Sequence, residues 1–125
     1  MKTINKTYTY EINIKKSRFI AVLCPVTNAN ETKEKITILK KEHPKAKHVI
    51  HAGVWGEKKD QFSFSDDKEP KYTAGKPVFN ILYASEFTNC GIFIIRYFGG
   101  ILLGRGGLQK AYAEAAKGVL KLVDH

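Results

Sequence analysis

The sequence predicts a single α+β domain that spans residues 1–125, and three observations support this fold class. Segments of alternating polarity and segments of helical periodicity follow one another in the order β-β-α-β-β-α-β-α, as in a layered α+β domain. Hydrophobic residues make up 43% of the chain and charged residues 26%, which is the composition of a globular protein. No internal repeat, low-complexity segment or linker divides the chain. The elements are therefore expected to form one domain.

The first two elements are predicted to be strands joined in a hairpin. Apolar and polar side chains alternate over residues 8–14, and the segment 17–26 follows after a turn at residues 15–17. Pro25 is expected at the end or edge of its strand because it has no N–H to donate to a neighbour.

A mostly solvated helix is expected next. Asn28 or Asn30 is suited to cap its N-terminus, and His43 before Pro44 ends it. Its apolar stripe is thin, and its polar surface carries much of the positive charge of this region, on Lys33, Lys35, Lys40 and Lys41.

The remaining elements follow from the same patterns. Residues 49–54 and 61–64 read as two strands, and a short helix is predicted to follow Pro77. The continuous apolar run 91–95 indicates a central strand buried on both faces. Apolar residues at helical spacing over 108–122 predict the last helix.

The formal net charge of +9 is concentrated in the first part of the chain. Residues 1–50 have a net charge of +7 and residues 51–125 a net charge of +2. A local basic surface suits phosphate-rich partners such as RNA. The alternative interpretation is a lysine-rich composition that only keeps the protein soluble.

Cysteine content and hydropathy bear on location. Cys24 and Cys90 both lie in apolar stretches, which favours a reducing compartment and two buried structural thiols. No apolar run is long enough to span a membrane, and the N-terminus lacks the apolar core of a signal peptide. We therefore expect a cytoplasmic protein with no membrane partner.

The glycine-rich segment 96–108 (RYFGGILLGRGGL) connects the buried strand to the last helix. Such a junction exposes backbone N–H groups and the positive end of a helix dipole, which attract anions. The sequence fits neither a P-loop nor a dinucleotide-binding pattern. Either the glycines allow tight turns and close packing, or the segment contacts a phosphate or an RNA backbone. The candidate contact residues are Arg96, Gly99, Gly100, Gly104, Arg105 and Gly107.

Three carboxylates, Asp66, Asp67 and Glu69, lie in the polar segment 65–75. Their spacing matches no calcium loop, so we expect them to cap the following helix or to pair with Arg96. His48 and His51 are three residues apart on a strand, point to opposite faces and are expected to pack rather than bind metal. Accordingly we expect no metal, no cofactor and no enzymatic activity.

Two long motifs, SDDKEPKYTAGKP and RYFGGILLGRGGLQKAY, resemble the signature of the YigZ/IMPACT family, and SRFIA at residues 17–21 fits it as well. The likeness spans residues 17–117. It implies a two-layer α+β domain with a mixed β-sheet packed by helices, like the second domain of a small-subunit ribosomal protein, with a left-handed β-α-β crossover. Bacterial relatives usually add a C-terminal ferredoxin-like domain and eukaryotic ones an N-terminal partner-binding domain.

The positions that match the first motif include Asp66, Asp67, Glu69, Thr73 and Gly75, and those that match the second include Arg96, Tyr97, Phe98, Gly99, Gly100, Gly104 and Gly107. Lys68 and Tyr72 stand where the family usually has glycine, and Arg105 stands where a small residue is common. We expect the two departures in the first motif to stiffen its loop. Tyr97 and Phe98 are either core residues or platforms for base stacking.

The resemblance links the chain to translation. Eukaryotic members inhibit a starvation-sensing kinase by competing for its activator, and nucleic-acid binding is inferred for bacterial members. We expect a non-enzymatic regulator or accessory factor of translation that binds RNA, the ribosome or a translation-regulatory protein. The alternative is an enzyme that handles a small molecule or a phosphate between the loops Asp66–Gly75 and Gly99–Gly107.

Overall fold

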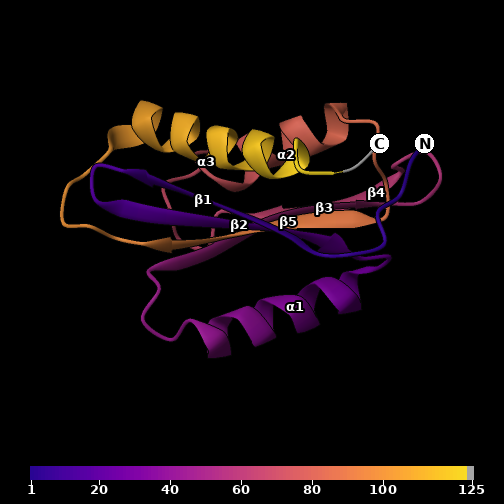
Figure 1. Ribbon diagram of the computed structural model, residues 1–125, viewed down its shortest axis with the longest axis horizontal. Coiled ribbons are helices and arrows are strands. Elements are labelled where there is room, and N and C mark those ends of the chain that lie inside the picture. Colours follow the sequence, from indigo (N-terminus) through magenta and orange to yellow (C-terminus); the bar gives the residue numbers. More distant parts are fainter. Residues whose placement is uncertain (124–125) are drawn as a thin grey trace.

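The computed structural model describes residues 1–123, and Figure 1 shows a twisted sheet with helices on both faces. All eight predicted elements are present in the predicted order. The strands are β1 (Tyr8–Ile14), β2 (Ser17–Pro25), β3 (His48–Trp55), β4 (Gln61–Ser65) and β5 (Cys90–Tyr97), and the helices are α1 (Ala29–Glu42), α2 (Gly75–Ala84) and α3 (Gly104–Leu120).

The five strands are arranged in the order β1-β2-β5-β3-β4, and every neighbouring pair is antiparallel. The α+β class is therefore confirmed, but the expected mixed sheet is wrong. The reason is the position of β5, which is inserted between β2 and β3 and so separates two strands that run in the same direction. The parallel pairing that the structure describes is an isolated bridge between Lys2 and Phe87, outside the named strands.

The helices form three layers with the sheet instead of the expected two. In Figure 1, α1 lies on one face and α2 and α3 lie on the other. The central strands are apolar on both faces, so each face needs a cover. Alternate residues of β5 show this: Ile92 and Ile94 belong to the core under α2 and α3, whereas Phe93 and Ile95 belong to the core under α1.

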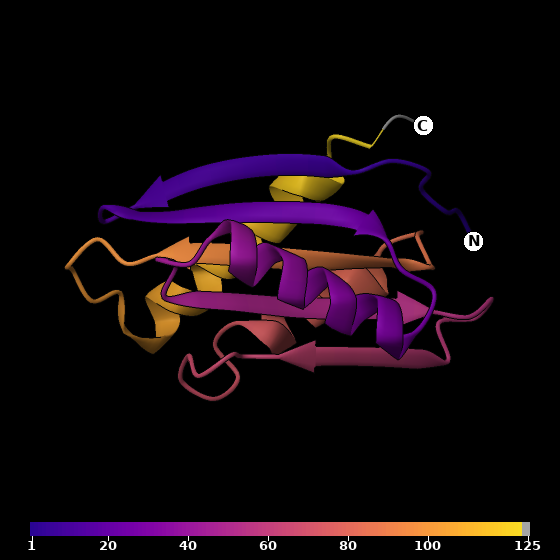
Figure 2. The same cartoon turned by 90° about the horizontal axis from the view of Figure 1, so that it is seen from below.

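Two helical crossovers connect strands that run in the same direction. The chain passes from β2 through α1 to β3, and from β4 through α2 to β5, each time skipping one strand of the sheet. Figure 2 shows the sheet from the α1 side, so α2 lies behind the sheet. Followed in this view from β4 through α2 to β5, the crossover is left-handed. This confirms the rare hand that the family resemblance implied.

Two helices begin earlier than predicted. α2 begins at Gly75, two residues before Pro77, because the Asp66 carboxylate accepts hydrogen bonds from the backbone N–H groups of Ala74 and Gly75 at 3.0 and 2.9 Å. α3 begins at Gly104 instead of Leu108. Its first turn is therefore made of the glycine-rich residues that were predicted to form a loop.

His51 lies buried on the α1 side of the sheet. Its ring stacks on Phe93 with the centroids 5.9 Å apart, and Nε2 lies 3.1 Å from the Ser63 hydroxyl. Burial lowers the pKa of His51 from 6.5 to about 4, against a smaller opposing effect of the Asp67 charge.

This shift predicts a pH dependence of stability. Between pH 6.5 and pH 4 the unfolded chain protonates His51 while the folded domain keeps it neutral. The free energy of unfolding is therefore expected to fall by about 3 kcal/mol as the pH drops through this range. Urea titrations at pH 7, 5.5 and 4 measure the effect, and His51→Phe, which retains a stacked ring, should lack it. An equal loss in both proteins would contradict this assignment.

Candidate functional site

A buried carboxylate, Glu69, organises the centre of the site. Glu69 accepts two hydrogen bonds from Nη1 of Arg96, at 3.0 and 2.9 Å, and one from the Tyr112 hydroxyl, and Nε2 of His48 lies 3.2 Å from its Oε1. Glu69, Arg96 and His48 are each less than 10% exposed. The predicted pairing of an acidic residue of the loop with Arg96 is thus confirmed. Since charges this deep need partners, the cluster anchors the loop to β3, β5 and α3.

The other two carboxylates of the segment are also engaged. Asp67 accepts hydrogen bonds from the backbone N–H of Val49 at 2.7 Å and from the Lys40 ammonium at 3.2 Å. Asp66 caps α2 and also accepts from the N–H of Tyr72 at 2.9 Å. We call residues 66–75 the motif loop. Its remaining predicted members are internal to the fold, since the Thr73 hydroxyl donates to the carbonyl of Pro70 and Gly75 opens α2.

The two departures from the family pattern lie at strained positions of the motif loop. Lys68 has φ +69° and Tyr72 has φ +66°, in the left-handed region that glycine adopts most easily. Glycine, which the family resemblance led us to expect at both positions, would adopt this conformation without strain. The side chains that replace it lie on the surface, with Lys68 at the rim of the pocket described below.

We call residues 99–107 the glycine loop, and its glycines have different structural roles. A Cβ at Gly99 would lie 2.1 Å from backbone atoms of Lys16, so only glycine allows the β1–β2 turn to pack there. Gly100 and Gly104 have φ +88° and +73°. Gly107 lies in the first turn of α3 against Leu103. The close packing that the sequence analysis considered is therefore found at Gly99. The N-terminus of α3 has no side-chain cap and no acidic residue in its first turn.

The motif loop and the glycine loop line one pocket of about 380 Å³, so the two loops lie side by side, as the alternative of an enzyme acting between them requires. Its walls are mostly apolar, its floor includes Glu69, Arg96 and His48, and Lys47, Lys68 and Arg105 line it as well. A second hollow of about 500 Å³ shares Lys47, His48 and Lys68 with it and reaches Lys40. We call the two together the basic groove.

The charge of the basic groove is positive. Lys40, Lys47, Lys68 and Arg105 are exposed at it, whereas its two carboxylates are already paired, Glu69 with Arg96 and Asp67 with Lys40. Arg105 donates to the carbonyl of Lys71 at 2.7 Å, which holds the guanidinium beside the motif loop. Because both carboxylates are neutralised by cations, the groove presents net positive charge to an anion.

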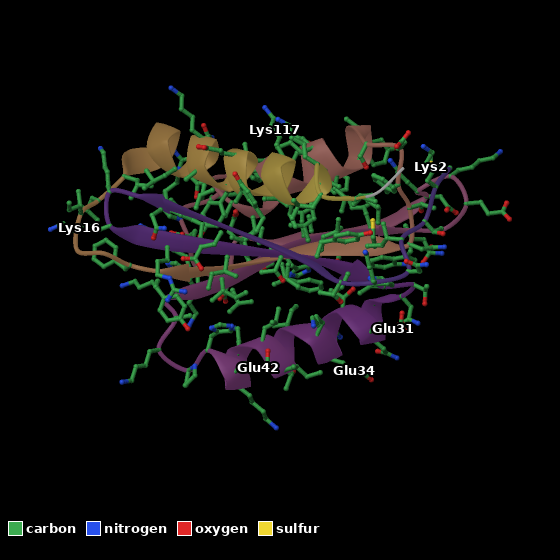
Figure 3. All side chains as sticks on the ribbon, in the orientation of Figure 1. Lys2, Lys16, Glu31, Glu34, Glu42 and Lys117 are labelled. Carbon is green, nitrogen blue, oxygen red and sulfur yellow. The ribbon has the colours of Figure 1, made fainter. Side chains whose placement is uncertain are left out.

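The other predicted site residues are divided between the groove and the α1 side of the sheet. Tyr97 faces α1, where its hydroxyl contacts Nδ1 of His43, whereas Phe98 lines the groove. Among the four lysines of α1, Lys40 reaches the groove, while Lys33 and Lys41 are exposed along the helix and Lys35 is half-buried. The same helix carries Glu31, Glu34 and Glu42, which Figure 3 labels, so its net charge is only +1.

Covalent chemistry finds little support among the described side chains. Burial raises the pKa of Cys90 to about 12, and burial together with the Glu69 charge raises the pKa of Tyr112. Both groups therefore stay protonated at neutral pH. Within residues 1–123, no three histidine, cysteine or acidic side chains are grouped to hold a metal ion, and no helix is long and apolar enough to cross a membrane.

The sequence patterns missed part of the site. Ser17, His48 and Tyr112 complete the buried cluster, Ser17 by accepting hydrogen bonds from Arg96 Nη2 and from the N–H of Gly99, both at 3.3 Å. These contacts join residues up to 82 positions apart, so no local spacing reveals them. One signal in the sequence was Tyr112, which lies on the apolar face of the last helix. A buried hydroxyl needs a hydrogen-bond partner, so this residue indicates a buried polar group beside the helix.

The fold and the site together define a class: an α+β domain with a left-handed crossover, in which two long motifs meet around a buried Glu–Arg pair and a basic groove. Residues 15–120 match the Impact N-terminal domain, and the chain belongs to this family.

Relatives of known sequence agree with this assignment. The chain is 42% identical to an IMPACT family member of Haemophilus influenzae over 92% of its own length and 57% of the relative's. It is 43% identical to IMPACT family member YigZ of Escherichia coli over 86% of this chain and 54% of that one, and 40% identical to YvyE of Bacillus subtilis over 90% and 52%. The chain thus spans a little over half the length of the curated relatives it matches.

Two solved structures share the fold. A crystal structure of a hypothetical protein superposes with a TM-score of 0.90 at 39% identity, covering 94% of this chain and 58% of that one. The two-domain translational regulator Yih1 superposes with a TM-score of 0.58 at 19% identity, covering 97% and 48%, which shows the shared fold.

Proposed function

We propose that this domain is a non-enzymatic, translation-associated binding module that contacts RNA, alone or on the ribosome, through the basic groove. The observation that carries the proposal is that both carboxylates of the groove are paired, while three further exposed cations, Lys47, Lys68 and Arg105, line it. Positive charge of this kind favours nucleic acid because binding releases counterions from the phosphates. Lys33, Lys35 and Lys41 on α1 lie outside the groove and would add to RNA binding only through long-range attraction.

Two further considerations support a role in translation. Yih1, which shares the fold, is described as a translational regulator. The family resemblance connects related domains with ribosomal-protein folds and with partners that regulate translation. Such a role would place the protein in the cytoplasm, with RNA, the ribosome or a translation-regulatory protein as its partner.

The proposal predicts RNA binding that depends strongly on salt. Fluorescence anisotropy with a short labelled single-stranded RNA and a matched duplex, over a salt series, should give dissociation constants in the micromolar range or below. The logarithm of the affinity should fall with the logarithm of the salt concentration by roughly 0.7 per phosphate contact on a single strand. Absence of binding at low salt would contradict RNA binding and would make a regulatory protein the partner to test.

A second candidate function is an enzyme that acts on a small molecule or phosphate in the same groove. The observation that favours it is that the motif loop and the glycine loop line one pocket. A hydrolase screen with divalent metals tests it against an Asp67→Asn variant. Metal-dependent turnover that Asp67→Asn abolishes would establish the enzyme, and no turnover in the wild-type protein would reject it.

A further inference from the structure

We propose that the 380 Å³ pocket between the motif loop and the glycine loop receives one unstacked base of a single-stranded RNA. The inference rests on the proposed RNA-binding function and adds to it a preference for single strands over duplex. It concerns the pocket alone and not the cationic surface around it, so the two can fail separately.

The chemistry of the pocket walls is the first argument. Five apolar residues line it, and most of its exposed surface is apolar although charged residues also line it: Pro70, Phe98, Leu102, Leu103 and Leu108. A surface that only tracked a phosphate backbone would need no such walls. Pockets of this kind take ligands with flat apolar faces, and about 380 Å³ is near the lower end of the range for small-molecule sites. One planar heterocycle with its sugar is a ligand of that class.

The exposure of the glycine loop is the second argument. Leu102 is 82% exposed and Phe98 is 41% exposed, although both line the pocket. Gly100 and Gly104, which lie two residues before and two residues after Leu102, both have positive φ. When a ligand covers exposed apolar groups of this kind, their burial lowers the free energy of the complex. A base that entered the pocket would bury part of both side chains.

The rim supplies the matching electrostatics for the adjacent phosphates. Lys47, Lys68 and Arg105 line the pocket, together with the first turn of α3, which lacks a side-chain cap. Phosphates on either side of an inserted base would lie close to these groups. Bases in a duplex are stacked and paired, so they cannot enter without strand opening. A single strand should therefore bind more tightly than a duplex of equal charge.

The test compares Leu102→Gln with the wild-type protein on a short single-stranded RNA, on the matched duplex and on inorganic polyphosphate. Leu102→Gln removes an exposed apolar group without changing the charge, and Ile38→Gln on α1, where Ile38 is 49% exposed, is the matched control. We expect Leu102→Gln to weaken single-strand binding by about tenfold, because an apolar contact with the base is lost, with an unchanged salt slope. Binding of the duplex and of polyphosphate, and all binding by Ile38→Gln, should stay unchanged.

The outcomes separate the inference from the proposed function. If the wild-type protein binds duplex as tightly as single strand and Leu102→Gln has no effect, the base pocket is wrong while RNA binding stands. If Leu102→Gln weakens binding of polyphosphate equally, the side chain does not contact a base and the inference is again wrong. If no nucleic acid binds at low salt, the proposed function fails and the inference fails with it.

Discussion

Replacing Arg96 with methionine is expected to lower the free energy of unfolding by about 3 to 5 kcal/mol, the usual cost of leaving a buried charge without its partner. The Arg96 guanidinium donates to both oxygens of Glu69, and both side chains are almost fully buried. Without it, Glu69 would keep only His48 and Tyr112 close to its carboxylate. Urea denaturation monitored by circular dichroism measures the loss.

Two controls make this prediction specific. The double variant Arg96→Met with Glu69→Met removes both charges and should recover part of the lost stability, because an apolar pair leaves no unpaired ion. Arg18→Met breaks the ion pair with Glu11, which lies on the surface, and should change stability little. Equal effects of Arg96→Met and Arg18→Met would show that the buried pair does not anchor the motif loop.

Charge reversal in the basic groove is expected to have the largest effect on RNA binding. Lys47, Lys68 and Arg105 line the groove, and replacing all three with glutamate should lower the affinity for single-stranded RNA by about a hundredfold at low salt. The salt slope should fall by about 2, since three phosphate contacts are lost at roughly 0.7 each. Anisotropy over the same salt series as for the wild-type protein gives both quantities.

The matched control reverses three lysines of α1. Lys33, Lys35 and Lys41 lie outside the groove, and their replacement by glutamate changes the net charge by the same amount. Because α1 alternates lysines with Glu31, Glu34 and Glu42, we expect a smaller loss of affinity from this variant. A loss equal to that of the groove variant would place the RNA on the general positive surface and not in the groove.

The sequence predicted the elements well because their patterns are local. The apolar run 91–95 was predicted as a central strand, and residues of both cores on β5 confirm it. The third layer was missed because α1 has a thin apolar stripe, with Leu39 buried and Ile36 only partly so. The start of α3 was missed because glycine-rich residues predict a loop, whereas Gly104–Gly107 form its first turn.

The site was predicted less completely, and the reason is physical. An ion pair between a carboxylate of the motif loop, here Glu69, and Arg96 was predicted because opposite charges on a loop and a strand tend to pair. The pocket depends on which strands become neighbours: β5 between β2 and β3 brings Ser17, His48 and Arg96 to one end of the sheet. That order is set by the left-handed crossover, which no periodicity encodes and which entered only through the family resemblance.

The most direct test of the basic groove is an NMR titration of ¹⁵N-labelled protein with a short single-stranded RNA. If the RNA binds in the groove, backbone signals of residues 43–48, 66–72 and 98–108 should shift and saturate at the affinity that anisotropy gives. Signals from the outer surface of α1 and from the separate hollow between α2 and α3, near Lys76 and Lys110, should move little. Saturating shifts confined to either of those surfaces, with the groove signals unchanged, would contradict the proposed function.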